Sequence, residues 1–198
     1  MQEGIIKFNC KWTDEPITIE QKVIEEMNKL RSALKEYNLI GVDEAGYGYG
    51  NISIKTDGDS QFYITGSQTG HLPTLSEDDI SLVTSYDFSK NELTCRGKAK
   101  ASSESLSHAA LYDTLSSVRY VIHIHSLSLW EKLFNVHPTT SSTAEYGTVE
   151  LANAISDLSK TAGKRRLFVL GGHREGILFY ADSFEEISGY AQTVIDKL

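Results

Sequence analysis

Two histidines alternate with isoleucine inside an apolar run near the middle of the chain, and no other feature restricts the fold as strongly. The run is Val121-Ile122-His123-Ile124-His125. Alternate side chains of a β-strand point to the same face of a sheet, so both imidazoles leave one face and both isoleucines leave the other. An apolar face must be covered by another layer of structure. The sequence therefore predicts a covered sheet in which an interior strand carries a histidine pair.

Helical and strand-like segments alternate around this run. Apolar residues spaced three or four apart predict helices at 18–37, with Thr18 as N-cap, and at 103–117, 149–160 and 184–198. Short β-branched and aromatic runs, separated by turn residues, predict strands at 51–55, 62–65, 81–87, 92–96, 121–126, 167–172 and 176–182. Strands grouped in hairpins with interspersed helices indicate an α/β fold with a mixed, mostly antiparallel sheet covered by helices.

Composition narrows the class of protein. A chain of 198 residues without a linker or repeat is expected to form a single domain, 1–198. Its net charge of −8 argues against nucleic acid as a partner. Cys10 and Cys95 are too few for a disulfide framework, which favours a reducing compartment. With neither a signal peptide nor a membrane-spanning run in view, we expect a cytoplasmic protein that does not bind membranes.

A third histidine extends the histidine pair into a candidate metal site. His123 and His125 share a strand face and can reach one ion, although two hydrogen-bonded structural histidines would give the same pattern. His173 follows Gly171-Gly172, where the backbone can bend sharply and aim a side chain. Three imidazoles on one cation would leave coordination positions open for a substrate.

Glu104 and the polar residues near it admit two interpretations. At the start of the 103–117 helix, Ser102 or Ser103 is a natural N-cap and Glu104 favours the helix dipole; spacing alone favours this interpretation. Alternatively, the serines bind an anion and Glu104 serves as an acid/base beside the metal. The small-residue loop 66–70 could cradle a phosphate or simply connect two strands. Asn51 is more typical of a turn than of a ligand.

Seven short motifs occur in a characteristic order, and together they resemble the class II aldolase/adducin family over residues 48–187. They are Gly50-Asn51-Ile52-Ser53-Ile54, Ile64-Thr65-Gly66-Ser67, Ala101-Ser102-Ser103-Glu104, Ser107-His108-Ala109-Ala110-Leu111-Tyr112, Val121-Ile122-His123-Ile124-His125-Ser126, Tyr146-Gly147-Thr148 and Gly172-His173-Arg174-Glu175-Gly176. The family includes fuculose- and rhamnulose-phosphate aldolases, a ribulose-phosphate 4-epimerase, dehydratases, decarboxylases and the non-catalytic adducin heads.

The resemblance implies a fold, an activity and a set of site residues. The fold would have three α/β/α layers, and the protein would assemble as a homotetramer. The activity would be retro-aldol cleavage of a ketose phosphate through a metal-stabilised enediolate. One divalent cation per chain is implied, with zinc expected and Mn²⁺, Fe²⁺, Co²⁺ or Ni²⁺ as replacements. The implied residues are His123, His125 and His173 for the metal, Glu104 as acid/base, and Asn51, Ser67, Thr69, Gly70, Ser102 and Ser103 for the phosphate.

The sequence also departs from the family pattern. Alanine stands at position 101, where the aldolases often have proline, and Gly176 comes three positions after His173 instead of directly after it. The segment 126–145 is short and lacks a tyrosine-bearing stretch that aldolases use near the leaving aldehyde. The alternatives are therefore a 4-epimerase, a dehydratase or a decarboxylase of the same family, or an adducin-like interaction module. Glutamate at position 104 argues against the epimerases, which typically carry aspartate there.

Overall fold

A computed structural model describes residues 5–57 and 60–198 of the chain. Its strands are β1 (Asn9–Thr13), β2 (Gly41–Val42), β3 (Gly48–Tyr49), β4 (Asn51–Lys55), β5 (Phe62–Thr65), β6 (Ile80–Asp87), β7 (Glu92–Arg96), β8 (Tyr120–His125), β9 (Leu167–Val169) and β10 (Gly176–Ala181). Its α-helices are α1 (Gln21–Glu36), α2 (Ser105–Thr114), α3 (Leu127–Leu133), α4 (Val149–Thr161) and α5 (Phe184–Ile195).

A single large sheet runs through the molecule. Within the described residues it has eight strands in the order β1-β7-β6-β5-β4-β8-β10-β9, while β2 and β3 form a separate hairpin. Only the β1–β7 pair is parallel among the described strand pairs. The expected mixed, mostly antiparallel sheet is confirmed.

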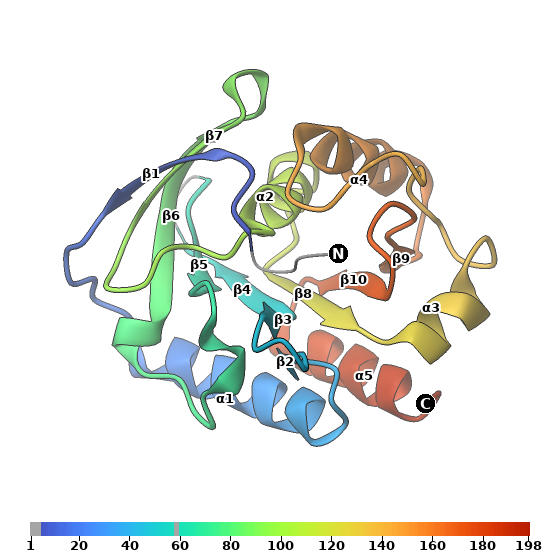
Figure 1. Cartoon of the computed structure of the whole chain (residues 1–198), viewed down its shortest axis with the longest axis horizontal. Coiled ribbons are helices and arrows are strands. Elements are labelled where there is room, and N and C mark those ends of the chain that lie inside the picture. The colour runs from blue at the N-terminus through green and yellow to red at the C-terminus, as the bar shows by residue number, and fades with distance from the viewer. Residues whose placement is uncertain (1–4, 58–59) are drawn as a thin grey trace.

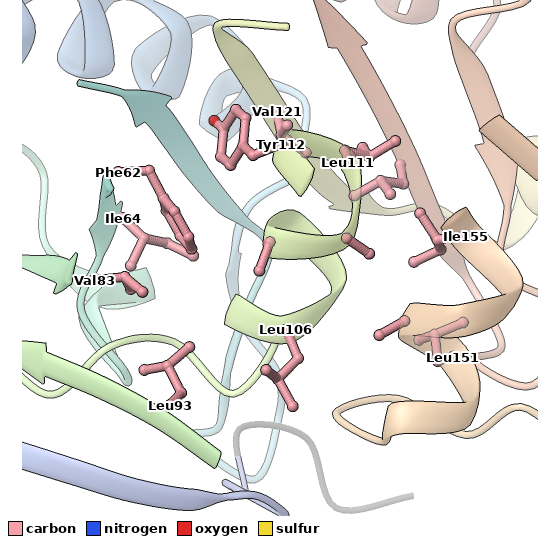
Figure 2. Packing of buried hydrophobic residues seen from close by; sticks show 14 of the residues in the cluster. Phe62, Ile64, Val83, Leu93, Leu106, Leu111, Tyr112, Val121, Leu151 and Ile155 are labelled. Atoms are coloured by element: carbon pink, nitrogen blue, oxygen red, sulfur yellow. The ribbon is translucent and has the colours of Figure 1, made fainter. Parts of the chain in front are cut away.

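Helices cover both faces of the sheet, which confirms the three α/β/α layers (Figure 1). On one face, α2 and α4 pack on β5 and β8 through a cluster that includes Phe62, Leu106, Val121 and Ile155 (Figure 2). On the other face, α1 and α5 pack through a second cluster, which contains Met27, Leu34, Ile52, Ile122 and Ile187.

The histidine strand β8 lies in the middle of this sandwich. Ile122 and Ile124 belong to the cluster under α1 and α5, and Val121 belongs to the cluster under α2 and α4. His123 and His125 alternate along the strand with Val121, so their side chains point to the same face as Val121, which is the α2–α4 face. No described helix is both long and apolar enough to cross a lipid bilayer.

Most of the predicted elements are present, with corrections at their ends. The 18–37 helix begins at Gln21; Glu20 stands at its N-cap without a capping side-chain bond, so the expectation for Thr18 was wrong. The 103–117 helix is shorter, Ser105–Thr114. Strand β1 was not predicted, because it is an edge strand whose partner, β7, lies some 80 residues further along the chain.

Candidate metal and anion site

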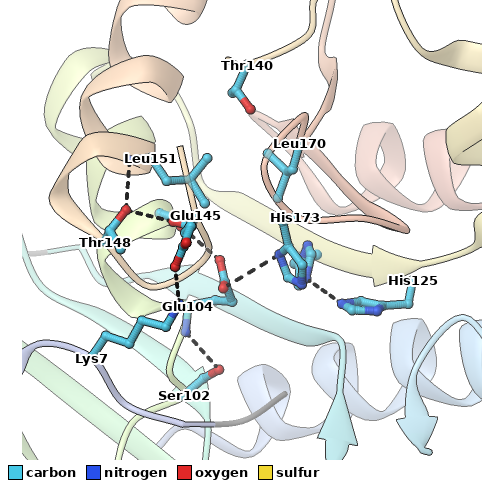
Figure 3. Close-up of polar contacts among 12 residues, drawn as sticks. Lys7, Ser102, Glu104, His125, Thr140, Glu145, Thr148, Leu151, Leu170 and His173 are labelled. Atoms are coloured by element: carbon cyan, nitrogen blue, oxygen red, sulfur yellow. Dashed lines mark hydrogen bonds and ion pairs between the residues drawn. The ribbon is translucent and has the colours of Figure 1, made fainter. Parts of the chain in front are cut away.

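Three imidazoles converge on the α2–α4 face of the sheet. His123 and His125 lie on β8, and His173 lies in the turn between β9 and β10. Figure 3 shows the rings of His125 and His173 near each other. Their ring centroids are 4.8 to 4.9 Å apart, and one ring nitrogen from each lies within 4.8 Å of the others. All three side chains are buried. Since β10 pairs with β8, the turn that carries His173 is brought beside the histidine strand.

The glycines around His173 lie in or beside a backbone turn, as expected, and they also permit close approach of other segments. A Cβ atom on Gly171 would overlap the carbonyl oxygen of Thr140, and one on Gly172 would overlap that of Ala144. A Cβ on Gly176 would lie 3.0 Å from ring atoms of both His123 and His173. Three glycines therefore allow the 140–144 segment and the histidine rings to pack against one turn.

The histidine cluster fits a divalent cation. Burial, and then the charges of His173, His125 and His108, hold the pKa of His123 well below its usual value, so this ring is neutral, as a metal ligand must be. The Nε2 atoms of His123 and His125 are 3.1 Å apart, a distance that a hydrogen bond between the two rings would also explain. Such a bond does not account for the third buried ring. Three buried imidazoles with nitrogens this close together suit zinc and its neighbours in the transition series.

Glu104 faces this cluster and does not cap a helix. It occupies the N-cap position of α2, yet its side chain makes no capping bond. Its carboxylate instead accepts a hydrogen bond from the Ser107 hydroxyl at 2.9 Å and lies 3.8 Å from Nδ1 of His173 (Figure 3). The side chain is only 3% exposed. The expectation of Ser102 or Ser103 as N-cap was wrong, because Glu104 itself precedes the helix that begins at Ser105, and its carboxylate turns toward His173.

A small polar cavity, here called the anion cavity, adjoins the cluster. Tertiary pairing assembles it: Gly66 bridges Ala101, and the Ser67 amide donates to the Lys100 carbonyl at 2.8 Å. Its lining includes every residue that the sequence nominated for phosphate, together with Glu104 and His123: Asn51, Ser67, Thr69, Gly70, Ser102 and Ser103. The buried amide oxygen of Asn51 has no hydrogen-bond partner among the described residues, as expected of a group that meets a ligand.

The hydrogen bonds within the anion cavity show which donors remain for a ligand. The Thr69 hydroxyl donates to the Gly66 carbonyl, and the Glu104 amide donates to the Ser102 hydroxyl oxygen. The hydroxyl proton of Ser102 stays available to a ligand. Of the two lysines that precede Ala101, Lys98 pairs with Asp14 and Lys100 lies over the ring of Trp12.

Two basic residues that sequence reasoning missed hold the 66–70 loop. Arg31 of α1 is 1% exposed and donates to the carbonyls of Thr69 at 2.7 Å and Gly70 at 3.1 Å. Lys35 donates to the carbonyls of Gly70 and Leu72 at 2.8 and 2.9 Å. The sequence did contain a signal for Arg31, because this arginine lies on the buried apolar side of an amphipathic helix. A buried charge requires hydrogen-bonding or charged partners.

We expect Ser102→Asp to weaken phosphate binding, because it places a carboxylate where the anion would sit. Two like charges at short range cost about 1 kcal/mol or more, so the affinity for inorganic phosphate should fall roughly fivefold or further. Calorimetric titration with phosphate measures the change. Ser116→Asp, at an exposed serine after α2, controls for net charge. An unchanged affinity in Ser102→Asp would remove this serine from the anion site.

Three other ring side chains lie around the histidine cluster. The Nδ1 of His108 hydrogen-bonds with the Ser53 hydroxyl at 2.7 Å, and burial lowers the pKa of His108 to about 3. The Tyr49 ring lies 5.3 Å from that of His125, and the Tyr146 ring lies 5.2 Å from that of His173. Neither tyrosine was assigned a role from sequence, although Tyr146 belongs to one of the motifs, since a single aromatic residue carries no periodic signal.

Comparisons with known proteins place the chain in a family. By structure it is similar to an L-fuculose 1-phosphate aldolase, with 24% identity over 88% of this chain and 85% of the other and a TM-score of 0.62. It is also similar to YgbL from Klebsiella pneumoniae, provisionally described as an aldolase/epimerase/decarboxylase, with 20% identity over 90% and 87% and a TM-score of 0.63. A third match is the L-fuculose-1-phosphate aldolase from Thermus thermophilus, with 16% identity over 90% and 96% and a TM-score of 0.54.

The sequence comparisons give one match and one negative result. No curated protein matches the chain. The profile named Class II Aldolase and Adducin N-terminal domain matches residues 32–195, which is most of the chain and includes the histidine cluster, Glu104 and the lining of the anion cavity. The protein therefore belongs to the class II aldolase and adducin family.

Proposed function

We propose that this protein is a metal-dependent aldolase that cleaves a ketose phosphate by a reversible retro-aldol reaction. The observation that carries the proposal is the position of Glu104. Its buried carboxylate lies 3.8 Å from a histidine of the cluster and also lines the anion cavity. A base, a cation site and an anion site within one small volume are what retro-aldol cleavage of a phosphorylated ketose requires.

Each part of the site has a separate task in this reaction. When bound to His123, His125 and His173, a divalent cation supplies Lewis-acid polarisation of the substrate carbonyl. The anion cavity holds the phosphate and so fixes the position of the neighbouring carbons. In cleavage, the hydroxyl of the carbon that becomes the aldehyde gives up its proton as the C–C bond breaks, and Glu104 delivers a proton to the other carbon of that bond; in the reverse reaction Glu104 removes this proton. The Ser107 hydroxyl keeps the Glu104 carboxylate oriented. The apolar clusters on either side exclude water from the buried rings.

The second candidate is an epimerase or decarboxylase that uses the same groups. It is favoured by the similarity to YgbL, whose description names those reactions. A non-catalytic adducin-like module is disfavoured, because a purely structural domain has no need for three buried histidines and a buried carboxylate around one point. We further propose zinc as the resident metal, a small phosphorylated sugar as substrate, a homotetramer as the assembly and the cytoplasm as the location.

A substrate panel tests the proposal. We expect the protein, purified without chelators and supplied with zinc, to release dihydroxyacetone phosphate from at least one ketose 1-phosphate in a set that varies in chain length and stereochemistry. Product analysis by mass spectrometry and NMR distinguishes cleavage from epimerisation or loss of carbon dioxide. Epimerised products without cleavage would select the second candidate. No turnover of any phosphorylated sugar by the metal-loaded protein would overturn the enzymatic proposal.

A further inference from the structure

Two cavities meet at the histidine cluster, and only one of them is used by the proposed phosphate site. The second, here called the distal cavity, has a volume of about 520 Å³ and is bordered by His125. Its polar lining comes from Asp43, Tyr49, Ser126, Arg174 and Glu175. The anion cavity is bordered by His123. A molecule bound at the cluster would therefore have one end in each cavity.

Tyr49 is the residue that lines both cavities within the described part of the chain. Three contacts fix its side chain. The ring lies 5.3 Å from the His125 ring, and the hydroxyl donates to the Asn38 carbonyl at 3.2 Å. A Cβ atom on Gly41 would lie 2.9 Å from the same hydroxyl oxygen, so the glycine provides the space that the phenol occupies. Tyr49 therefore forms a wall of defined position between the cavities.

The charges of the distal cavity differ from those of a phosphate site. Asp43 and Glu175 contribute two carboxylates, and Arg174 contributes one guanidinium. One oxygen of Asp43 accepts hydrogen bonds from the amides of Ala45 and Tyr47, which holds this carboxylate at the rim. The lining thus has an excess of one negative charge. Carboxylates accept hydrogen bonds from hydroxyl groups, whereas a second phosphate would be repelled.

We propose that the distal cavity holds the non-phosphorylated end of the substrate, and that Tyr49 is the specificity-determining residue that separates this end from the phosphorylated one. The inference rests on the proposed function. Glu175 and Arg174 then select a hydroxylated, uncharged end over one that carries a second phosphate. The β2–β3 hairpin, which carries Asp43, and the turn that carries Arg174 and Glu175 would then supply the charged groups that recognise this end.

The proposal is tested by removing one negative and one positive charge of the distal cavity in separate variants. The measured quantity is the ratio of kcat/KM for a ketose 1-phosphate to that for the corresponding ketose bisphosphate. Glu175→Gln should lower this preference roughly fivefold or more, and Arg174→Gln should raise it by a similar factor, since the charges have opposite signs. A merely structural role for either residue would not move the ratio in opposite directions. The same two ligands, titrated calorimetrically into these variants in a Glu104→Gln background, give a readout independent of turnover.

Tyr49 has its own pair of variants. Tyr49→Phe keeps the ring and should retain the parent's discrimination among ketose 1-phosphates whose distal ends differ by one carbon. Tyr49→Ala joins the cavities and should reduce that discrimination, which for one methylene is roughly tenfold or more, to within a few-fold. Tyr47→Ala, at a residue that lines neither cavity, is the matched control. Circular dichroism and melting confirm that each variant is folded.

The outcomes separate this inference from the proposed function. If the metal-loaded parent cleaves no ketose phosphate, the proposed function is overturned and this inference falls with it. If the parent cleaves one, but the charge variants leave the ratio unchanged and Tyr49→Ala discriminates as the parent does, only the inference is overturned. Opposite shifts in the two charge variants, together with lost discrimination in Tyr49→Ala, support both.

Discussion

Glu104→Gln is expected to lower turnover of a ketose phosphate by about a hundred- to ten-thousand-fold while the fold and the bound metal are retained. Glutamine keeps the shape of the side chain and can still accept the hydrogen bond from Ser107, but it cannot take up a proton. The carboxylate is 3% exposed and 3.8 Å from His173, so no solvent base can easily replace it. Turnover, metal content and the melting temperature, measured in parallel, separate loss of the base from loss of the fold.

Glu145→Gln is the matched control for this experiment. Glu145 is the nearest alternative carboxylate to the Tyr146 motif along the sequence, but its side chain is 67% exposed and pairs with Lys7 at 3.1 Å. We expect turnover close to that of the parent. If Glu104 were only a helix-terminal charge, its replacement would cost about 0.3–1 kcal/mol of stability and leave turnover intact. Undiminished turnover in Glu104→Gln would exclude it as the catalytic base.

His123→Ala is expected to abolish stoichiometric metal binding and, with it, activity. Its ring lies within the cluster, and burial keeps it neutral, so its nitrogen is available to a cation at neutral pH. Removing a residue that only hydrogen-bonds to a metal ligand lowers metal affinity roughly 10- to 100-fold. Removing the ligand itself should therefore lower the affinity more than about a hundredfold. Elemental analysis after purification without chelators should find one divalent ion per parent chain and little in the variant.

A histidine outside the cluster provides the comparison. His137→Ala removes an imidazole that is not part of the cluster and should leave the metal content unchanged. Because the cavity left by His123→Ala is buried, its melting temperature must be measured too. Calorimetric titration of zinc into both proteins then compares folded samples. Equal metal content in His123→Ala and His137→Ala, or no metal in the parent, would contradict the metal assignment.

The local spacing of apolar residues along the sequence predicted much of the fold. The alternation in Val121 to His125 predicted a strand with its histidines on one face, and the apolar spacing of 149–160 and 184–198 predicted helices found at nearly those bounds. The ordered motifs also nominated the histidines, Glu104 and the anion-cavity residues that the fold brings together. The predictions of strands and helices succeeded because each depends on neighbours within one element, where spacing along the chain determines which side chains share a face.

Tertiary structure alone decided how those residues meet. Spacing along the chain favoured Glu104 as a helix charge, and only the start of α2 at Ser105 and the packing of the β9–β10 turn direct its carboxylate at His173. Likewise, Arg31 of α1 reaches the 66–70 loop, and Tyr49 lies between two cavities, through contacts between distant segments. Such contacts depend on how elements pack and on which backbones approach closely, and one sequence carries no local signal for either.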